Sequence, residues 1–74
     1  MSMVANFPVY RIDGVQTIAV ADIIADSKPA TMPTNGKDIE GLPDDAILQP
    51  GSTLLDCSNG KIYMYTPSKS WNEI

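Results

Sequence analysis

Histidine is absent from this chain, and cysteine occurs once, at Cys57. Without histidine, the commonest general base is missing, and neither a Ser-His-Asp nor a Cys-His catalytic arrangement can be built. A single thiol cannot form an internal disulfide, and it has no second thiol or imidazole with which to share a zinc site. We therefore expect no catalytic residue, no metal site and no cofactor, and we predict that the protein is not an enzyme.

Positive charge and long apolar runs are also scarce. Five Lys and Arg residues stand against nine Asp and Glu residues, which gives a net charge of −4. Because binding to phosphates depends on Lys and Arg, we expect no nucleic-acid partner. The longest apolar run, residues 18–21, is far shorter than the roughly 20 residues of a spanning helix. The first six residues lack the charged start and apolar stretch of a signal peptide, so we expect no membrane partner.

The chain is short for a self-sufficient domain. Its 74 residues suffice for one small domain, residues 1–74. A domain of this size buries only about 60% of the surface that its unfolded chain exposes, so its stability is marginal. Small domains are commonly stabilised by disulfides, metals or oligomerisation, and the composition excludes the first two. We therefore expect association with other chains, including copies of itself.

Residues 52–74 predict a three-stranded antiparallel meander. Asn59-Gly60 is a strong hairpin signal because a type I′ turn requires positive φ at both central residues. With these residues at the tip, alternation of side chains divides the hairpin into two faces. The face expected to be the core holds Leu55, Cys57, Ile62 and Met64, and the other holds Leu54, Asp56, Lys61, Tyr63 and Tyr65. A turn at residues 67–70 then returns the chain as a third strand at residues 71–74.

Residues 1–26 form an N-terminal arm or hairpin. Two β-rich runs flank Asp13-Gly14, which predicts a hairpin over residues 9–20. The alternative is a helix that begins at an Asp13 N-cap, with Gln16 completing a capping box, and that ends near Ser27 before Pro29. The β-branched residues between positions 15 and 20 favour the strands.

Residues 27–51 contain four prolines and three glycines. Proline lacks the backbone donor that a central strand needs, so we expect a long irregular segment in an otherwise mainly β fold. Its one ordered stretch is a short helix at residues 43–48, where Pro43 occupies the first position and Asp44-Asp45 the first turn. Irregular segments of this length are uncommon inside compact domains. We therefore interpret it as an extended connecting arm that lies on another subunit.

Five apolar residues are the candidate interface: Leu54, Tyr63, Tyr65, Trp71 and Phe7. Aromatic side chains carry much of the binding energy at protein contacts. A single sheet has two faces, and so short a chain has too few apolar residues to cover both. Two alternatives remain for the aromatic residues, which are completion of the chain's own core and stacking on a carbohydrate.

Several short motifs resemble a family of small virion-associated structural proteins of tailed phages. These motifs are Asp26-Ser27-Lys28-Pro29, Leu42-Pro43, Pro50-Gly51-Ser52-Thr53, Gly60-Lys61-Ile62-Tyr63-Met64-Tyr65 and Trp71. The resemblance covers residues 26–74, and it implies a head-fibre, capsid-decoration or connector-like protein. It further implies synthesis in the bacterial host cytoplasm, a place in the virion beside other virion proteins, and no cofactor. The alternative function is a small phage or bacterial inhibitor that binds a single host protein, which small size and acidic charge suit equally well.

Overall fold

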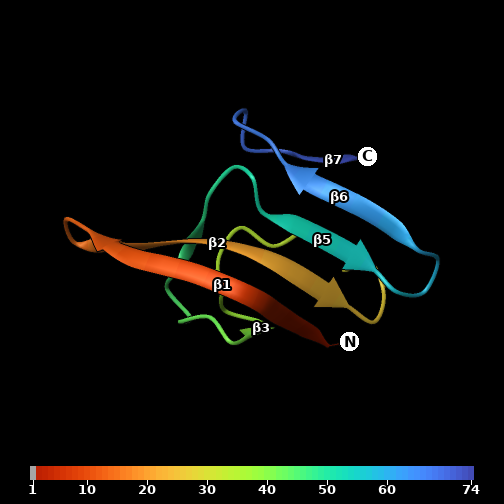
Figure 1. Cartoon of the computed structure of the whole chain (residues 1–74), viewed down its shortest axis with the longest axis horizontal. Helices are drawn as coiled ribbons and strands as arrows, with labels where there is room; N and C mark the ends of the chain where they lie inside the picture. Colours follow the sequence, from red (N-terminus) through yellow and green to blue (C-terminus); the bar gives the residue numbers. More distant parts are fainter. Residues whose placement is uncertain (1) are drawn as a thin grey trace.

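The computed structural model describes residues 2–74 and shows a mainly β protein built on one mixed sheet (Figure 1). The strands are β1 (Met3–Asp13), β2 (Gln16–Ala25), β3 (Ile39–Glu40), β4 (Ile47–Leu48), β5 (Thr53–Asp56), β6 (Lys61–Tyr65) and β7 (Trp71–Glu73). Their order across the sheet is β3-β1-β2-β5-β6-β7. β4 also pairs with β2, at Ile18 and Ala19, ahead of the part of β2 that pairs with β5. Over the described residues there is no helix, and therefore none long and apolar enough to cross a membrane.

β1 and β2 form a long antiparallel hairpin around Gly14. Their pairing extends from Met3↔Ala25 to Asp13↔Gln16, well beyond the expected residues 9–20. Gly14 has a φ of +65°, whereas Val15 does not adopt positive φ, which is the pattern of a type II′ turn. The helical alternative for residues 13–26 is wrong, because every second residue from Ala19 to Ala25 is buried and this period of two belongs to a strand.

β5, β6 and β7 form the C-terminal antiparallel meander that residues 52–74 predict. The turn between β5 and β6 has four residues instead of two, because Asp56 pairs with Lys61. The Asp56 carboxylate accepts hydrogen bonds from the amide and hydroxyl of Ser58, at 2.9 and 2.6 Å, and such a local bond starts the turn early. Gly60, with a φ of +71°, ends the turn. Cys57 therefore lies in an exposed loop, and its predicted place in the core is wrong.

The core lies on the opposite face of the β5–β6 hairpin from the one predicted. Leu54, Asp56, Tyr63 and Tyr65 are buried, whereas Ile62 and Met64 are exposed and Leu55 is half-buried. The grouping of residues into two faces agrees with the alternation, but the prediction of which face is covered is wrong. The cause is the segment that packs against the tyrosines.

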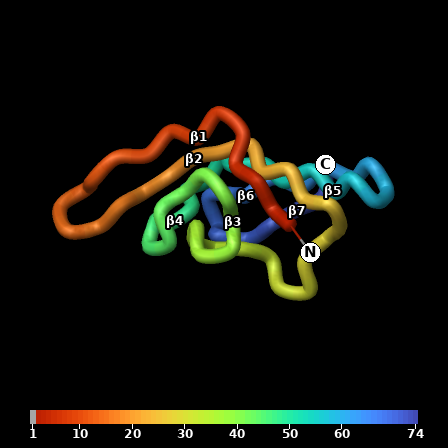
Figure 2. The backbone as a smooth tube through the Cα atoms, turned by 90° about the horizontal axis from the view of Figure 1, so that it is seen from below, coloured from red at the N-terminus to blue at the C-terminus, as the bar shows by residue number. Residues whose placement is uncertain are grey.

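Residues 26–52, which we call the covering segment, cross one face of the sheet (Figure 2). Their apolar residues join the tyrosines and β2 in a single core cluster, to which they contribute Ile39, Leu42, Ala46 and Leu48. The expectation that residues 27–51 lie on another subunit is therefore wrong, because this segment packs on the chain's own sheet. We call the face beneath it the covered face.

The helix expected at residues 43–48 is absent. The amide of Ala46 donates to the carbonyl of Pro43 at 3.1 Å and closes a single turn, after which Ile47 and Leu48 pair with β2. So short a stretch offers too few helical hydrogen bonds to offset the cost of nucleation. Alternate residues, Ala46 and Leu48, are instead fully buried, which is the pattern of an extended chain.

The backbone of the covering segment is satisfied although it is irregular. The Gln49 amide donates to Ala19 at 2.9 Å, where β4 ends. Between β4 and β5, the buried Ser52 hydroxyl accepts the Ala21 amide at 3.3 Å and donates to the Gln49 carbonyl at 3.0 Å. Gly51, with a φ of +98°, supplies the left-handed position of the turn after Pro50. The Ser52 side chain thus accepts the β2 amide that lies between the pairings with β4 and β5, since buried backbone groups need a hydrogen-bond partner.

Gly36 lies where two parts of the covering segment approach most closely. It is buried, its amide donates to the Ala46 carbonyl at 2.9 Å, and its φ is not positive. A β-carbon built at this position would lie 2.9 Å from the Leu42 β-carbon and closer still to the Pro43 carbonyl oxygen. The requirement for glycine is therefore steric.

Replacement of Gly36 by alanine is expected to lower the free energy of unfolding by about 1–3 kcal/mol, because the added methyl group overpacks a backbone contact. Urea denaturation followed by circular dichroism measures this change. Thr34→Ala is the matched control, since Thr34 is exposed nearby and should shift stability by less than about 0.5 kcal/mol. Equal effects of the two substitutions would contradict the close packing at Gly36.

Asp26 joins the end of β2 to the start of the chain. The Ser2 amide donates to the Asp26 carboxylate at 2.9 Å, and the Asp26 amide donates to the Ser2 carbonyl at 3.1 Å. The hydrogen bond from the Ser2 amide lowers the pKa of the Asp26 carboxyl below its ordinary value, because it stabilises the ionised form.

Because the pKa of Asp26 is lower in the folded chain than in the unfolded chain, this carboxylate stabilises the fold above the unfolded-state pKa. That contribution is lost as the pH falls through the folded-state pKa. A carbon-13 NMR titration is expected to give Asp26 a lower midpoint in the folded protein than in the urea-unfolded chain. Identical midpoints in the two states would rule out the bond to Ser2 in solution.

Candidate interaction surface

The aromatic residues of the meander hold the covering segment in place. The indole Nε1 of Trp71 donates to the Pro33 carbonyl at 2.7 Å. The Trp71 ring lies against Tyr65, with ring centroids 5.0 Å apart and a tilt of 38°. The Lys28 ammonium lies 5.3 Å from the centre of the Tyr63 ring, within the range of a cation–π interaction. Two of these contacts, to Pro33 and Lys28, join β7 and β6 to residues distant in the sequence, and the third joins β6 to β7.

The structure brings four of the five candidate interface residues together and separates the fifth. Leu54, Tyr63 and Tyr65 are buried in the chain's own core, and Trp71 is half-buried against it. In this conformation the three buried side chains are not available to a partner, which matches the alternative that they complete the core. Phe7 is 78% exposed and has a φ of +50°, within the irregularity where the pairing of β1 with β2 shifts.

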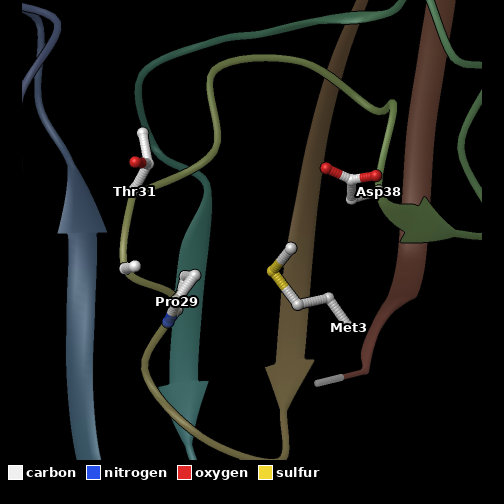
Figure 3. Close-up of a pocket in the computed structure, with 5 residues that line it drawn as sticks. Met3, Pro29, Thr31 and Asp38 are labelled. Carbon is white, nitrogen blue, oxygen red and sulfur yellow. The ribbon is translucent and has the colours of Figure 1, made fainter.

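A shallow groove of about 430 Å³ lies between the start of β1 and the covering segment (Figure 3). Met3 and Asp38 line one side of it, and Pro29 and Thr31 line the other. A neighbouring hollow of about 250 Å³ shares Met3, Thr31 and Asp38 with it. Asp38 is the one ionisable side chain in the larger groove. Within residues 2–74, no group of three or more His, Cys, Asp or Glu side chains is placed to hold a metal ion.

The other face of the sheet, which we call the open face, has no segment across it (Figure 2). The strand register aligns its apolar side chains in a row, because Val4 lies opposite Ile24, Ile24 beside Leu55, and Leu55 opposite Ile62. The amide of Ile74 donates to the Ile62 carbonyl at 2.8 Å and extends the row past β7. Together with its neighbours, the row comprises Val4, Ile18, Val20, Ile24, Leu55, Ile62, Met64 and Ile74.

Five side chains on the open face, Val4, Val20, Ile24, Ile62 and Met64, are each between 37% and 44% exposed. Each is partly shielded by its neighbours on the sheet and otherwise meets solvent. Within β1 as far as Asn6, and in β2, β5, β6 and β7, Asp22 is the one charged residue on this face, and it accepts a hydrogen bond from the Thr53 hydroxyl at 2.8 Å. A mostly polar row lies beside the apolar row, since Asn6 pairs with Asp22 and Asp22 with Thr53. The exposed apolar side chains make the open face a candidate interaction surface.

Sequence reasoning placed Leu55, Ile62 and Met64 on one apolar face but took that face for the core. It missed Val4, Val20 and Ile24, which extend the same face onto β1 and β2. The missing signal is present in β2, where apolar residues occupy both sides of the strand: Ala19, Ala21, Ile23 and Ala25 are buried, and Val20 and Ile24 are not. A strand that is apolar on both sides predicts that each face of the sheet has a partner.

The distal half of the β1–β2 hairpin projects from the sheet (Figure 1). Its exposed apolar residues are Phe7, Val9, Tyr10, Ile12 and Val15. β3 pairs with β1 at Met3 and Val4, and no strand within the described residues pairs with the outer edge of β1 beyond them. We call residues 7–17 the projecting arm.

Comparison of the chain with protein-family models, curated proteins and solved structures gave no match. The inference of function therefore depends on the surfaces described above. The two that stand out are the open face and the projecting arm, because both expose large apolar side chains.

Trp71→Phe is expected to destabilise the fold by about 1 kcal/mol, because it keeps an aromatic ring against Tyr65 but leaves the Pro33 carbonyl without its donor. Trp71 is the sole tryptophan, so the variant has no tryptophan fluorescence with which to follow unfolding. Urea unfolding followed by far-UV circular dichroism is therefore the suitable measurement. Tyr10→Phe on the projecting arm is the matched control and should leave stability unchanged, since Tyr10 is half exposed. No difference between the two variants would contradict the anchoring role of Trp71.

Proposed function

We propose that this chain is a non-enzymatic structural component of a tailed-phage particle, such as a capsid auxiliary, head-fibre or connector protein. It is made in the cytoplasm of the bacterial host and acts in the virion by packing against copies of itself and against other virion proteins. The observation that carries the proposal is the open face, where an apolar row across the sheet has no cover from its own chain.

Burial of the open face offers a large share of the stability available to so small a chain. Each Å² of apolar surface removed from water contributes about 25 cal/mol. A single sheet covered on one side has half of the burial of a sandwich, and a domain of this size has little stability to spare. In a particle each contact is repeated many times, so modest contacts add through a high effective concentration.

The motifs that resemble virion proteins fall at positions that shape this surface. Pro50-Gly51-Ser52-Thr53 forms the turn that leads into β5, and Gly60 ends the turn that leads into β6. Trp71 begins β7 and anchors the meander to the covering segment. These positions keep the strands that carry Leu55 and Ile62 in register.

The projecting arm favours the second candidate function, an inhibitor of a single host protein. A narrow hairpin with exposed Phe7, Tyr10 and Ile12 suits insertion into a groove or addition to a sheet edge of that protein. Recovery of one stoichiometric host protein with the tagged chain from a host lysate supports the inhibitor. Its recovery with several particle proteins supports the virion component.

Mass spectrometry of purified particles tests the leading proposal. The chain is expected at a constant ratio to other particle proteins across the fractions of a density gradient, because a structural component is present in a set number of copies. The soluble fraction of the same infected cells is the control for expression. Detection in that fraction together with absence from the particles would contradict the proposal.

A further inference from the structure

We propose that the open face binds the open face of a second copy of this chain, related by a two-fold axis, to form a two-sheet sandwich. The biological setting of this dimer rests on the proposed function, whereas the choice of occupant rests on the size and charge of the face itself. The contacting side chains are those of the apolar row, Val20 and Met64 included.

The open face is smaller than the outline of the molecule. In the view of Figure 1 the whole chain, projecting arm included, measures 38 × 24 Å, so the open face suits an interface at the low end of the size range, which begins below about 600 Å² per partner. The row crosses β1, β2, β5 and β6 and continues to Ile74, so the apolar surface spans the sheet. Two such sheets pack face to face at about 10 Å when their side chains interdigitate.

Most charged side chains lie away from the open face, as burial of that face against a second copy requires. Asp22, the one charged residue in the body of the open face, is hydrogen-bonded to Thr53. The ion pair between Lys61 and Glu73, at 3.6 Å, lies on the side of the covered face. The covering segment holds most of the other charges: Asp26, Lys28, Lys37, Asp38, Glu40, Asp44 and Asp45. Glu40 is the exception, because it pairs with Val4 and so lies on the open face, at the β3 edge of the sheet. Two copies joined at their open faces therefore keep the other six charges on opposite outer surfaces.

The same charge distribution disfavours an anionic lipid surface as the occupant. Lysine and arginine clusters attract proteins to anionic lipids, but this chain has a net charge of −4. No lysine or arginine lies on the open face outside the projecting arm. A face that carries an apolar row and no basic residue suits an identical face better than an anionic lipid, and a two-fold interface must be complementary to itself.

Sedimentation equilibrium of the pure chain, with the variant Ile62→Glu, tests the dimer. The wild type is expected to be a dimer at 100 µM or below, and the variant is expected to raise the dimer dissociation constant by about 100-fold or more, because two unpaired carboxylates enter an apolar interface. Ile62 is 44% exposed in the single chain, so the variant should fold, which circular dichroism checks.

Ile12→Glu is the matched control, since Ile12 is 76% exposed on the projecting arm and points to the side of the covered face. It is expected to leave the dissociation constant unchanged. A dimer that is disrupted by Ile12→Glu and not by Ile62→Glu would overturn the inference in favour of pairing through the arm. A methyl NMR dilution series gives an independent readout, in which the resonances of Ile24, Leu55 and Ile62 are expected to shift with concentration.

Failure of the dimer and failure of the proposed function give different results. A wild-type chain that stays monomeric at 100 µM overturns the two-fold interface, whether or not the chain is found in purified particles. The chain could instead form a dimer that meets the tests above and yet be absent from purified particles. That result supports the interface and overturns the virion role.

Discussion

The packing of the covering segment against the tyrosine face of the sheet is the contact on which the rest of the structure depends. It joins residues far apart in the sequence: the indole of Trp71 donates to Pro33, and Met32 packs on the same core. It buries Tyr63 and Tyr65, which a lone meander would expose. It also uses the chain's only long connection, so the other face of the sheet keeps its apolar side chains in contact with solvent.

Small side chains on the covered side of β2 have a steric role. On the covered side β2 presents three alanines, Ala19, Ala21 and Ala25, and small side chains let an irregular backbone approach the strand. Gly36 serves the same purpose within the covering segment, where a β-carbon would meet Leu42 and Pro43. Large side chains occur on both sides of the sheet: Ile23, Tyr63 and Tyr65 are buried on the covered side, and Ile24 and Ile62 lie on the open side.

A sheet covered on one side separates the charged part of this chain from an apolar face that its own segments leave open. Seven of the fourteen charged residues lie in the covering segment. The open face carries Asp22 and, at its β3 edge, Glu40, and its apolar row has no cover from the described part of the chain. The projecting arm extends the contact surface beyond the sheet body, so a neighbour can be reached through either surface. Each part of the chain thus either stabilises its own fold or is available to a neighbour.

The sequence by itself determined the local structure: the hairpin about Gly14, the meander within residues 52–74 and the two faces of the β5–β6 hairpin follow from turn residues and alternation. Only the tertiary structure decided which face of the β5–β6 hairpin is buried, because both faces carry large apolar side chains and alternation alone does not distinguish them. It also decided the place of the covering segment, which depends on contacts such as Trp71 to Pro33 across 38 positions. Such contacts follow from packing in three dimensions, which no local pattern of residues specifies.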